Sequence, residues 1–136
     1  MKTKVLLAVF LGGAIGSAAR FGVLLAIESL ALADLNQELV ATAIVNLSGA
    51  LLLGVVHGIG ATRSENWKGF WGPGLAGGFT TMSGLALITA GSELGLSSSG
   101  YLYWIAVALQ LAVGVLTYWL GRLLTDRRGA KLVSKN

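Results

Sequence analysis

Hydrophobic and polar residues alternate along this chain in long blocks rather than in short periods. Four apolar blocks, residues 5–27, 39–59, 70–90 and 101–120, are separated by short polar connections. A helix of about 20 apolar residues crosses the roughly 30 Å hydrocarbon core of a bilayer. The pattern therefore predicts an all-α membrane protein, with four transmembrane helices in a single domain that covers residues 1–136.

The third block contains the stretch GGFTTMSG, residues 77–84, where a membrane helix should be most regular. Glycines favour an interruption there, and threonine hydroxyls compete for backbone hydrogen bonds. Non-helical backbone survives at membrane depth only inside protein or against a water-filled cavity. We expect a third helix that is broken near its middle and exposes carbonyl and N–H groups to ions. From this stretch alone, an unbroken helix with a glycine packing face is equally compatible.

The net charge of +4 comes mostly from the two ends of the chain. Charged residues make up 12% of the sequence, hydrophobic residues 54%, and the mean hydropathy is +0.75, which is too apolar for a small soluble domain. With four spans, nine of the ten Lys and Arg residues fall on one side of the membrane, and the tenth is Arg20 within the first block. The nine are Lys2, Lys4, Arg63, Lys68, Arg122, Arg127, Arg128, Lys131 and Lys135. Positive charge in short loops favours the cytoplasm, so we expect both termini inside.

Few residues are suited to catalysis or to binding metals through side chains. The chain has no cysteine, six acidic residues and a single histidine, His57, and these form no catalytic set, so we predict that it is not an enzyme. His57 fits a packing role near the end of the second block. The acidic residues Glu28, Asp34, Glu38 and Glu93 lie at block ends or in connections. A proton-coupled exporter of the small multidrug type needs an acid deep in a helix, so this alternative is weak.

Two polar residues at membrane depth are the candidates for ion handling. Arg20 is either an anchor at the outer headgroups or a cation at the floor of an aqueous vestibule. Asn46, near the middle of the second block, either joins two helices or donates its amide N–H to an ion in a pore. Gly12, Gly13 and Gly16 fit close helix packing. A chain of four short helices encloses little interior, so we expect a water-filled path between chains, and hence at least a dimer.

Three motifs point to one family: GGAIGSAARF at 12–21, TAIVNLSGALLLG at 42–54 and GGFTTMSGL at 77–85. In this order, and over nearly the whole length, the chain resembles the Fluc/CrcB fluoride channels. The motifs look like that family's G-x-x-G-x-x-x-R-Y/F, T-x-x-V-N-x-x-G and GGxTTFSTF patterns. The resemblance implies an antiparallel dimer with two pores in the bacterial cell membrane. It also implies passive efflux of fluoride, which reduces fluoride toxicity in the cytoplasm.

The resemblance also implies roles for individual residues. The backbone carbonyls of Gly77 and Thr80 from both subunits would hold a central structural Na⁺. Arg20 would lie at an aqueous vestibule. The residues expected along the pore or anion path are Asn46, Thr81, Met82, Ser83 and Leu85.

The departures from the family pattern bear on the partner. Met82 and Leu85 stand where the family has phenylalanines, and neither offers the positive ring edge that suits an anion. An antiparallel homodimer needs a nearly neutral charge bias, which this chain lacks. We therefore expect one subunit of a heterodimeric pair, whose second chain is homologous and of opposite topology. The alternatives are a non-conducting scaffold subunit of such a pair and a homodimer that overrides its charge bias.

Overall fold

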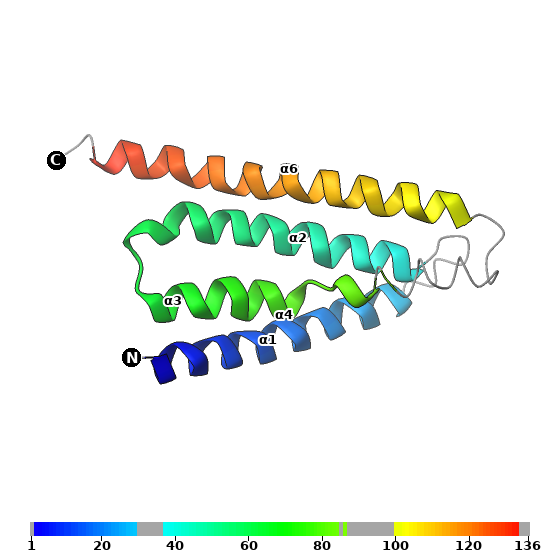
Figure 1. Ribbon diagram of the computed structural model, residues 1–136, viewed down its shortest axis with the longest axis horizontal. Coiled ribbons are helices and arrows are strands. Elements are labelled where there is room, and N and C mark those ends of the chain that lie inside the picture. The colour runs from blue at the N-terminus through cyan, green and yellow to red at the C-terminus, as the bar shows by residue number, and fades with distance from the viewer. Residues whose placement is uncertain (1, 30–36, 85, 87–99, 134–136) are drawn as a thin grey trace.

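In the computed structural model, residues 2–29, 37–84, 86 and 100–133 are described, and every regular element among them is helical. Three helices are long: α1 (Lys2–Ser29), α2 (Gln37–Ile59) and α6 (Gly100–Val133). Between α2 and α6 come the 3₁₀ turn η1 (Gly60–Thr62), helix α3 (Glu65–Gly69), the π-helical turn η2 (Phe70–Ala76) and α4 (Gly77–Phe79) (Figure 1). The predicted all-helical class is confirmed for this part of the chain.

Three segments among the described residues are long and apolar enough to cross a membrane: Lys2–Ser29, Leu39–Ile59 and Trp104–Thr125. They coincide with the first, second and fourth apolar blocks. The third block continues past residue 84 into positions that lie mostly outside the described residues. Four crossing helices in one domain therefore stay a prediction, as does the antiparallel dimer.

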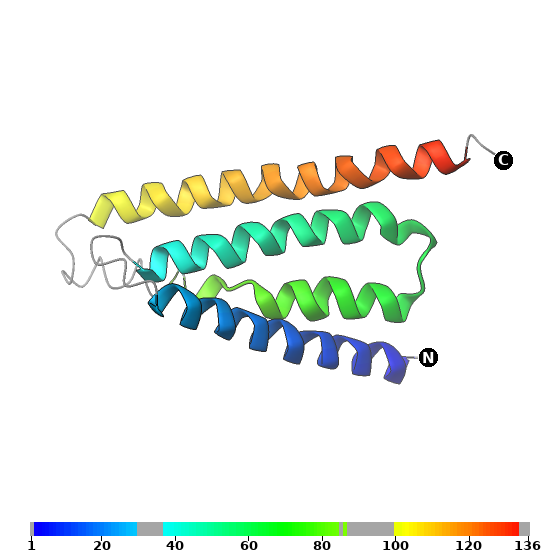
Figure 2. The same cartoon turned by 180° about the vertical axis from the view of Figure 1, so that it is seen from behind.

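The helices lie side by side in the order α6, α2, α3–α4 and α1, and views from the two sides agree (Figures 1 and 2). The start of α1, the turn between α2 and α3, and the end of α6 share one end of the bundle (Figure 1). The segments that carry Lys2, Lys4, Arg63 and Lys68 therefore meet at this end, as the charge pattern requires. Which side of a membrane this end faces stays a prediction.

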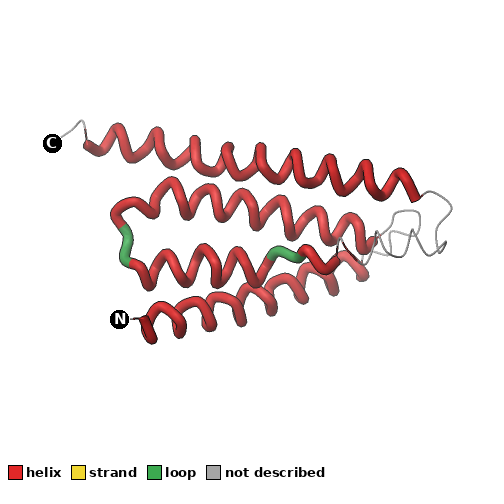
Figure 3. The backbone as a smooth tube through the Cα atoms, viewed as in Figure 1, coloured by secondary structure: helices red, strands yellow, loops and turns green. Residues whose placement is uncertain are grey.

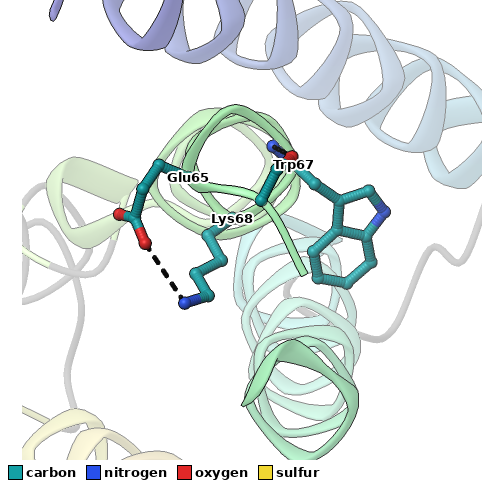
Figure 4. A network of polar contacts seen from close by, with 4 residues as sticks. Glu65, Trp67 and Lys68 are labelled. Carbon is teal, nitrogen blue, oxygen red and sulfur yellow. Dashed lines mark hydrogen bonds and ion pairs between the residues drawn. The ribbon is translucent and has the colours of Figure 1, made fainter. Parts of the chain in front are cut away.

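Helix α3 begins at a polar cap at this end of the bundle. Ser64 is extended, and its hydroxyl accepts a hydrogen bond from the N–H of Trp67 at 3.3 Å, which satisfies a donor at the helix start. One turn on, the Lys68 ammonium pairs with the Glu65 carboxylate at 3.2 Å (Figure 4). Pro73 follows within η2, where its missing N–H favours a departure from regular α-helical bonding.

Glycines allow the helices to approach closely at two interfaces. On α1, a Cβ on Gly12 would overlap the carbonyl oxygen of Phe70, and a Cβ on Gly16 would overlap that of Leu75. Between α2 and α6, Gly54 and Gly121 would make similar overlaps with the facing backbone. Small residues permit such contacts in lipid, where packing replaces the hydrophobic driving force. The packing role predicted for Gly12 and Gly16 is confirmed.

Replacing Gly12 with alanine should destabilise the fold by about 1–3 kcal/mol, because η2 would have to move away from α1. Gly22, on the same helix, is the matched control, since a Cβ there meets nothing within 4 Å. Gly22→Ala should be neutral or slightly stabilising, because alanine is the better helix former. Thermal unfolding in detergent, followed by tryptophan fluorescence, measures both variants. Equal midpoints for the two would contradict the close contact.

Candidate functional site

The helical path that begins at Glu65 is interrupted at Thr80 and Thr81. Helix α4 ends at Phe79, Thr80 is extended with φ −76° and ψ 159°, and residues 82–84 are helical again (Figure 3). The N–H of Thr80 still donates to the carbonyl of Ala76 at 3.0 Å, so the change begins at the following peptide. The break that the sequence predicts within residues 77–84 is therefore present.

The glycines of this stretch have a different role from the one the sequence suggested. Gly77 and Gly78 remain helical, and a Cβ on Gly78 would overlap the backbone of Gly13 on α1. Gly78 thus allows close packing against α1, while the two threonines form the break itself. On the other side, Gly49 of α2 leaves room for the methyl group of Thr80.

Asn46 braces the break from α2. Its side-chain oxygen accepts a hydrogen bond from the N–H of Thr81 at 2.7 Å, and its amide nitrogen donates to the Thr81 carbonyl at 3.0 Å. In an unbroken helix the N–H of Thr81 would donate to the carbonyl of Gly77, so the Asn46 contact replaces a helical bond. The amide has a second N–H, which these two contacts leave available. Of the two roles considered for Asn46, the structure shows the joining of two helices.

Arg20 reaches the break from α1. Its Nη1 donates a hydrogen bond to the Thr80 carbonyl at 3.1 Å, in a partly buried position. The guanidinium therefore contacts the interior of the bundle at Thr80. The other lone pair of the Thr80 carbonyl is not used by this contact.

A cavity of about 340 Å³ lies between the break, α2 and α6. Its polar lining comes from Asn46, Thr80, Gln110 and Tyr118, and the rest of its wall is apolar. Met82 lines it as well and is 69% exposed, so this side chain lies at the open side. A mostly apolar hollow with a few polar groups is the usual form of a small-ligand site.

The other predicted pore residues lie close to the break. The hydroxyls of Thr81 and Ser83 are 3.0 Å apart, and the Thr81 hydroxyl also accepts the N–H of Gly84 at 3.2 Å. Leu85 lies outside the described residues. The structure thus groups Asn46, Thr81, Met82 and Ser83 around one segment of backbone.

Comparison with known proteins places the chain in a family. Residues 7–122 match the family described as CrcB-like protein, Camphor Resistance (CrcB). The chain belongs to the CrcB-like family. A protein from Bacillus subtilis named fluoride-specific ion channel FluC 2 is 38% identical over 121 residues, which cover 87% of this chain and 85% of that protein.

Other relatives of this CrcB-like chain carry similar names. The fluoride-specific ion channel FluC of Caulobacter sp. strain K31 is 42% identical over 92 residues, 65% of this chain and 69% of that protein. The fluoride-specific ion channel FluC 2 of Rhodococcus jostii is 34% identical over 123 residues, 88% of this chain and 97% of that protein.

Two residues of the cavity were not assigned to a site by sequence reasoning. Gln110 is only 8% exposed, and its amide nitrogen donates to the Thr42 carbonyl at 3.2 Å. The Tyr118 hydroxyl lies 2.9 Å from Nδ1 of His57. Both residues stand on α6, together with Gly114, at intervals of four along the same face. Polar residues at this spacing in an otherwise apolar helix were the feature of the sequence that could have identified them.

The Na⁺ predicted for this CrcB-like chain would depend on backbone oxygens. Among the described residues, no group of three or more His, Cys, Asp or Glu side chains could hold a metal. The Gly77 carbonyl has lost Thr81 as its helical donor, and the Thr80 carbonyl lies in extended backbone. Carbonyl oxygens suit a hard cation, so the two positions fit a Na⁺. The Thr80 carbonyl also accepts the hydrogen bond from Arg20.

Proposed function

We propose that the chain is a subunit of a fluoride-selective channel, through which fluoride leaves the cell passively and cytoplasmic toxicity falls. The relatives named fluoride-specific ion channels, which match along most of the chain, support this function. The observation that carries it is the break at Thr80–Thr81, braced by Asn46 and Arg20 inside an otherwise apolar bundle. Irregular backbone and a buried cation are costly at membrane depth. Proteins keep such groups there where they line a path for ions or other polar species.

The cavity beside the break provides the anion path in this proposal. Arg20 supplies positive charge at the break and raises the local concentration of anions. The second N–H of Asn46, which lines the cavity, replaces part of the hydration of fluoride, and the paired hydroxyls of Thr81 and Ser83 do so beside the cavity. The apolar wall of the cavity strengthens the contact with Asn46. Met82 contributes no ring edge, so an aromatic edge in the path comes from a second chain.

The second subunit is part of the proposal. Large apolar side chains on the outer helices are exposed, including Phe10 on α1 at 71% and Leu116 on α6 at 66%, and they require lipid or protein around them. The partner inserts in the opposite direction and, given the charge bias, is a homologous chain of opposite bias. A C-terminal tag detected on both faces of intact membranes would contradict this assignment.

The structural Na⁺ belongs to the same dimer. The carbonyls of Gly77 and Thr80 from two subunits would hold it, and it would stabilise the contact between the two breaks. Purification with Na⁺ replaced by a large organic cation should then lower the thermal midpoint of the dimer. Equal thermal midpoints with and without Na⁺ would contradict a stabilising Na⁺ in the dimer.

Efflux from proteoliposomes tests the function directly. Vesicles loaded with fluoride and carrying the chain, alone or with its homologous partner, should release fluoride to an ion-selective electrode faster than protein-free vesicles. They should take up no cationic dye when a proton gradient is applied, unlike vesicles that carry a small multidrug-type exporter. A non-conducting scaffold predicts instead that Met82→Phe in this chain changes nothing, and the names of the relatives do not favour that role.

A further inference from the structure

Helix α6 is longer than the membrane segment that it contains. Its apolar span runs from Trp104 to Thr125, and the helix continues to Val133, at the end of the bundle where the other basic segments meet (Figure 1). Residues 126–133 add about 12 Å of helix. The headgroup layer on each side of a bilayer is about 5–8 Å thick. The continuation of α6 is therefore long enough to pass through the headgroups of this leaflet.

One face of α6 is apolar and exposed up to this level. The large side chains on the last turns of the span are each 50% exposed or more, namely Leu116, Trp119, Leu120, Leu123 and Leu124. Leu116 and Leu120 lie on the side of the helix opposite Gly114, which lines the cavity beside the break. An apolar face that is turned away from the cavity in a membrane helix is suited to lipid.

The position of Arg122 marks where α2 and α6 leave the hydrocarbon core. A Cβ on Gly58 of α2 would lie 3.0 Å from the carbonyl oxygen of Arg122. The apolar span of α2 ends at Ile59, one residue after Gly58. Arg122 is exposed and therefore stands at the depth of the headgroups, beside the exposed apolar face of α6.

Trp119 supports the guanidinium of Arg122 at this depth. The guanidinium carbon lies 5.6 Å from the centroid of the Trp119 ring, and the face of the indole attracts the cation. A stacked guanidinium donates hydrogen bonds in its own plane, in the fork geometry that phosphate oxygens accept. Tryptophan itself is enriched at the level of lipid headgroups. The pair thus has the chemistry of a site for a lipid phosphate.

The continuation of α6 adds further positive charge. Its basic residues are Arg127, Arg128 and Lys131. They stand about 3–9 Å beyond Thr125 along the helix, at the depth of the headgroup layer. Helical spacing places these three positions on one side of α6 and the single acid, Asp126, on the other. A headgroup with net negative charge complements this end of the helix, whereas a zwitterionic headgroup brings an ammonium of its own.

We propose that the end of α6 binds acidic phospholipids, and that Arg122, supported by Trp119, holds the headgroup phosphate nearest the hydrocarbon core. The acyl chains lie along the exposed apolar face of α6. Clusters of basic residues that directly follow a membrane helix attract acidic lipid headgroups. A lipid is favoured over a nucleic acid because the basic positions continue from an apolar membrane face at headgroup depth. The inference needs α6 to span the membrane and does not depend on the ion that the chain conducts.

Lipid binding to the purified full chain in detergent, followed by native mass spectrometry, tests the inference. Phosphatidylglycerol and phosphatidylcholine with the same acyl chains are the probes. Wild type should bind phosphatidylglycerol about tenfold or more tightly than phosphatidylcholine, since each basic residue near the headgroups contributes about fivefold. Arg122→Gln should therefore weaken phosphatidylglycerol binding about fivefold. Lys4→Gln is its matched control, because it removes the same charge from α1, at the other edge of the bundle, and should change binding less than twofold (Figure 1).

A second pair of variants tests the role of the indole without a change of charge. Trp119→Leu keeps the apolar face and removes the support for Arg122, so phosphatidylglycerol binding should weaken about two- to fivefold. Trp104→Leu makes the same change at the opposite end of the span, where Trp104 is 53% exposed, and should bind phosphatidylglycerol like wild type.

The inference is overturned by equal affinities of wild type for the two lipids. Equal losses in Arg122→Gln and Lys4→Gln would also overturn it, because net charge would then act without a site on α6. If Arg122→Gln is recovered unfolded, Trp119→Leu still decides, since wild-type binding by that variant is incompatible with the proposed pair. A single-stranded oligonucleotide that displaces bound phosphatidylglycerol and is not displaced by it would make the end of α6 a nucleic-acid site instead. Fluoride efflux is measured separately, so failure of this inference leaves the proposed function intact.

Discussion

Asn46→Asp is expected to reduce fluoride efflux by about 100-fold or more. The new carboxylate would lie about 3.0 Å from the Thr81 carbonyl but has no proton to donate to it. One of the two hydrogen bonds between residue 46 and Thr81 would therefore be lost. The new charge would also lie beside the anion path. Two like charges about 4 Å apart repel by roughly 4 kcal/mol at the effective dielectric of a protein, and every 1.4 kcal/mol is tenfold.

The matched control is Asn66→Asp. Asn66 is exposed on α3, away from the break, so the same chemical change should leave efflux nearly unchanged. Asn46→Leu separates the loss of the hydrogen bonds to Thr81 from the effect of the added charge, because it removes the hydrogen bonds without adding a charge. Initial efflux rates per reconstituted protein, with folding checked by gel filtration, measure all three variants. Wild-type efflux by Asn46→Asp would mean that Asn46 lies off the path and serves only in packing.

The main features of the fold follow from the apolar blocks. Long apolar runs predict membrane helices because lipid leaves the backbone no other bonding partner, and α1, α2 and α6 occur where three of these runs lie. The interruption near Thr80 was also predictable, because threonine hydroxyls compete for backbone bonds; here the hydroxyl of Thr80 binds the Ala76 carbonyl at 3.0 Å.

The residues of the candidate site could be predicted from the sequence, but the contacts between them could not. Asn46 and Arg20 stand out in sequence because polar groups at membrane depth are costly. That Asn46 binds Thr81, or that Arg20 binds Thr80, depends on how α1 and α2 lie against α4, and no local pattern encodes that arrangement. Tyr118 was missed for a related reason. A tyrosine near the end of an apolar block is ordinary, and its contact with His57 across two helices is what distinguishes it.

Arg20→Met should reduce fluoride efflux by about tenfold to 100-fold. Methionine keeps much of the apolar stem and removes the guanidinium, so the Thr80 carbonyl loses its partner in a partly buried position. Loss of a hydrogen bond to a charged group corresponds to about 1.5–3 kcal/mol, and the break would lose one of its two braces. The positive charge that concentrates anions at the break disappears with it. The fall should appear in the initial rate of release measured with a fluoride electrode.

Arg63→Met is the control for Arg20→Met. Arg63 lies in the turn after η1 with its guanidinium 5.6 Å from the centroid of the Trp67 ring, and its loss should change efflux little. Arg20→Lys separates charge from geometry, because an ammonium keeps the charge but lacks the planar fork of donors. If Arg20 acts mainly by concentrating anions, Arg20→Lys should retain most of the efflux, and raising the fluoride concentration should rescue Arg20→Met. If it acts mainly by holding Thr80, both variants should stay impaired at high fluoride and unfold at lower temperature. Efflux equal to wild type in Arg20→Met would show that the contact with Thr80 has no part in conduction.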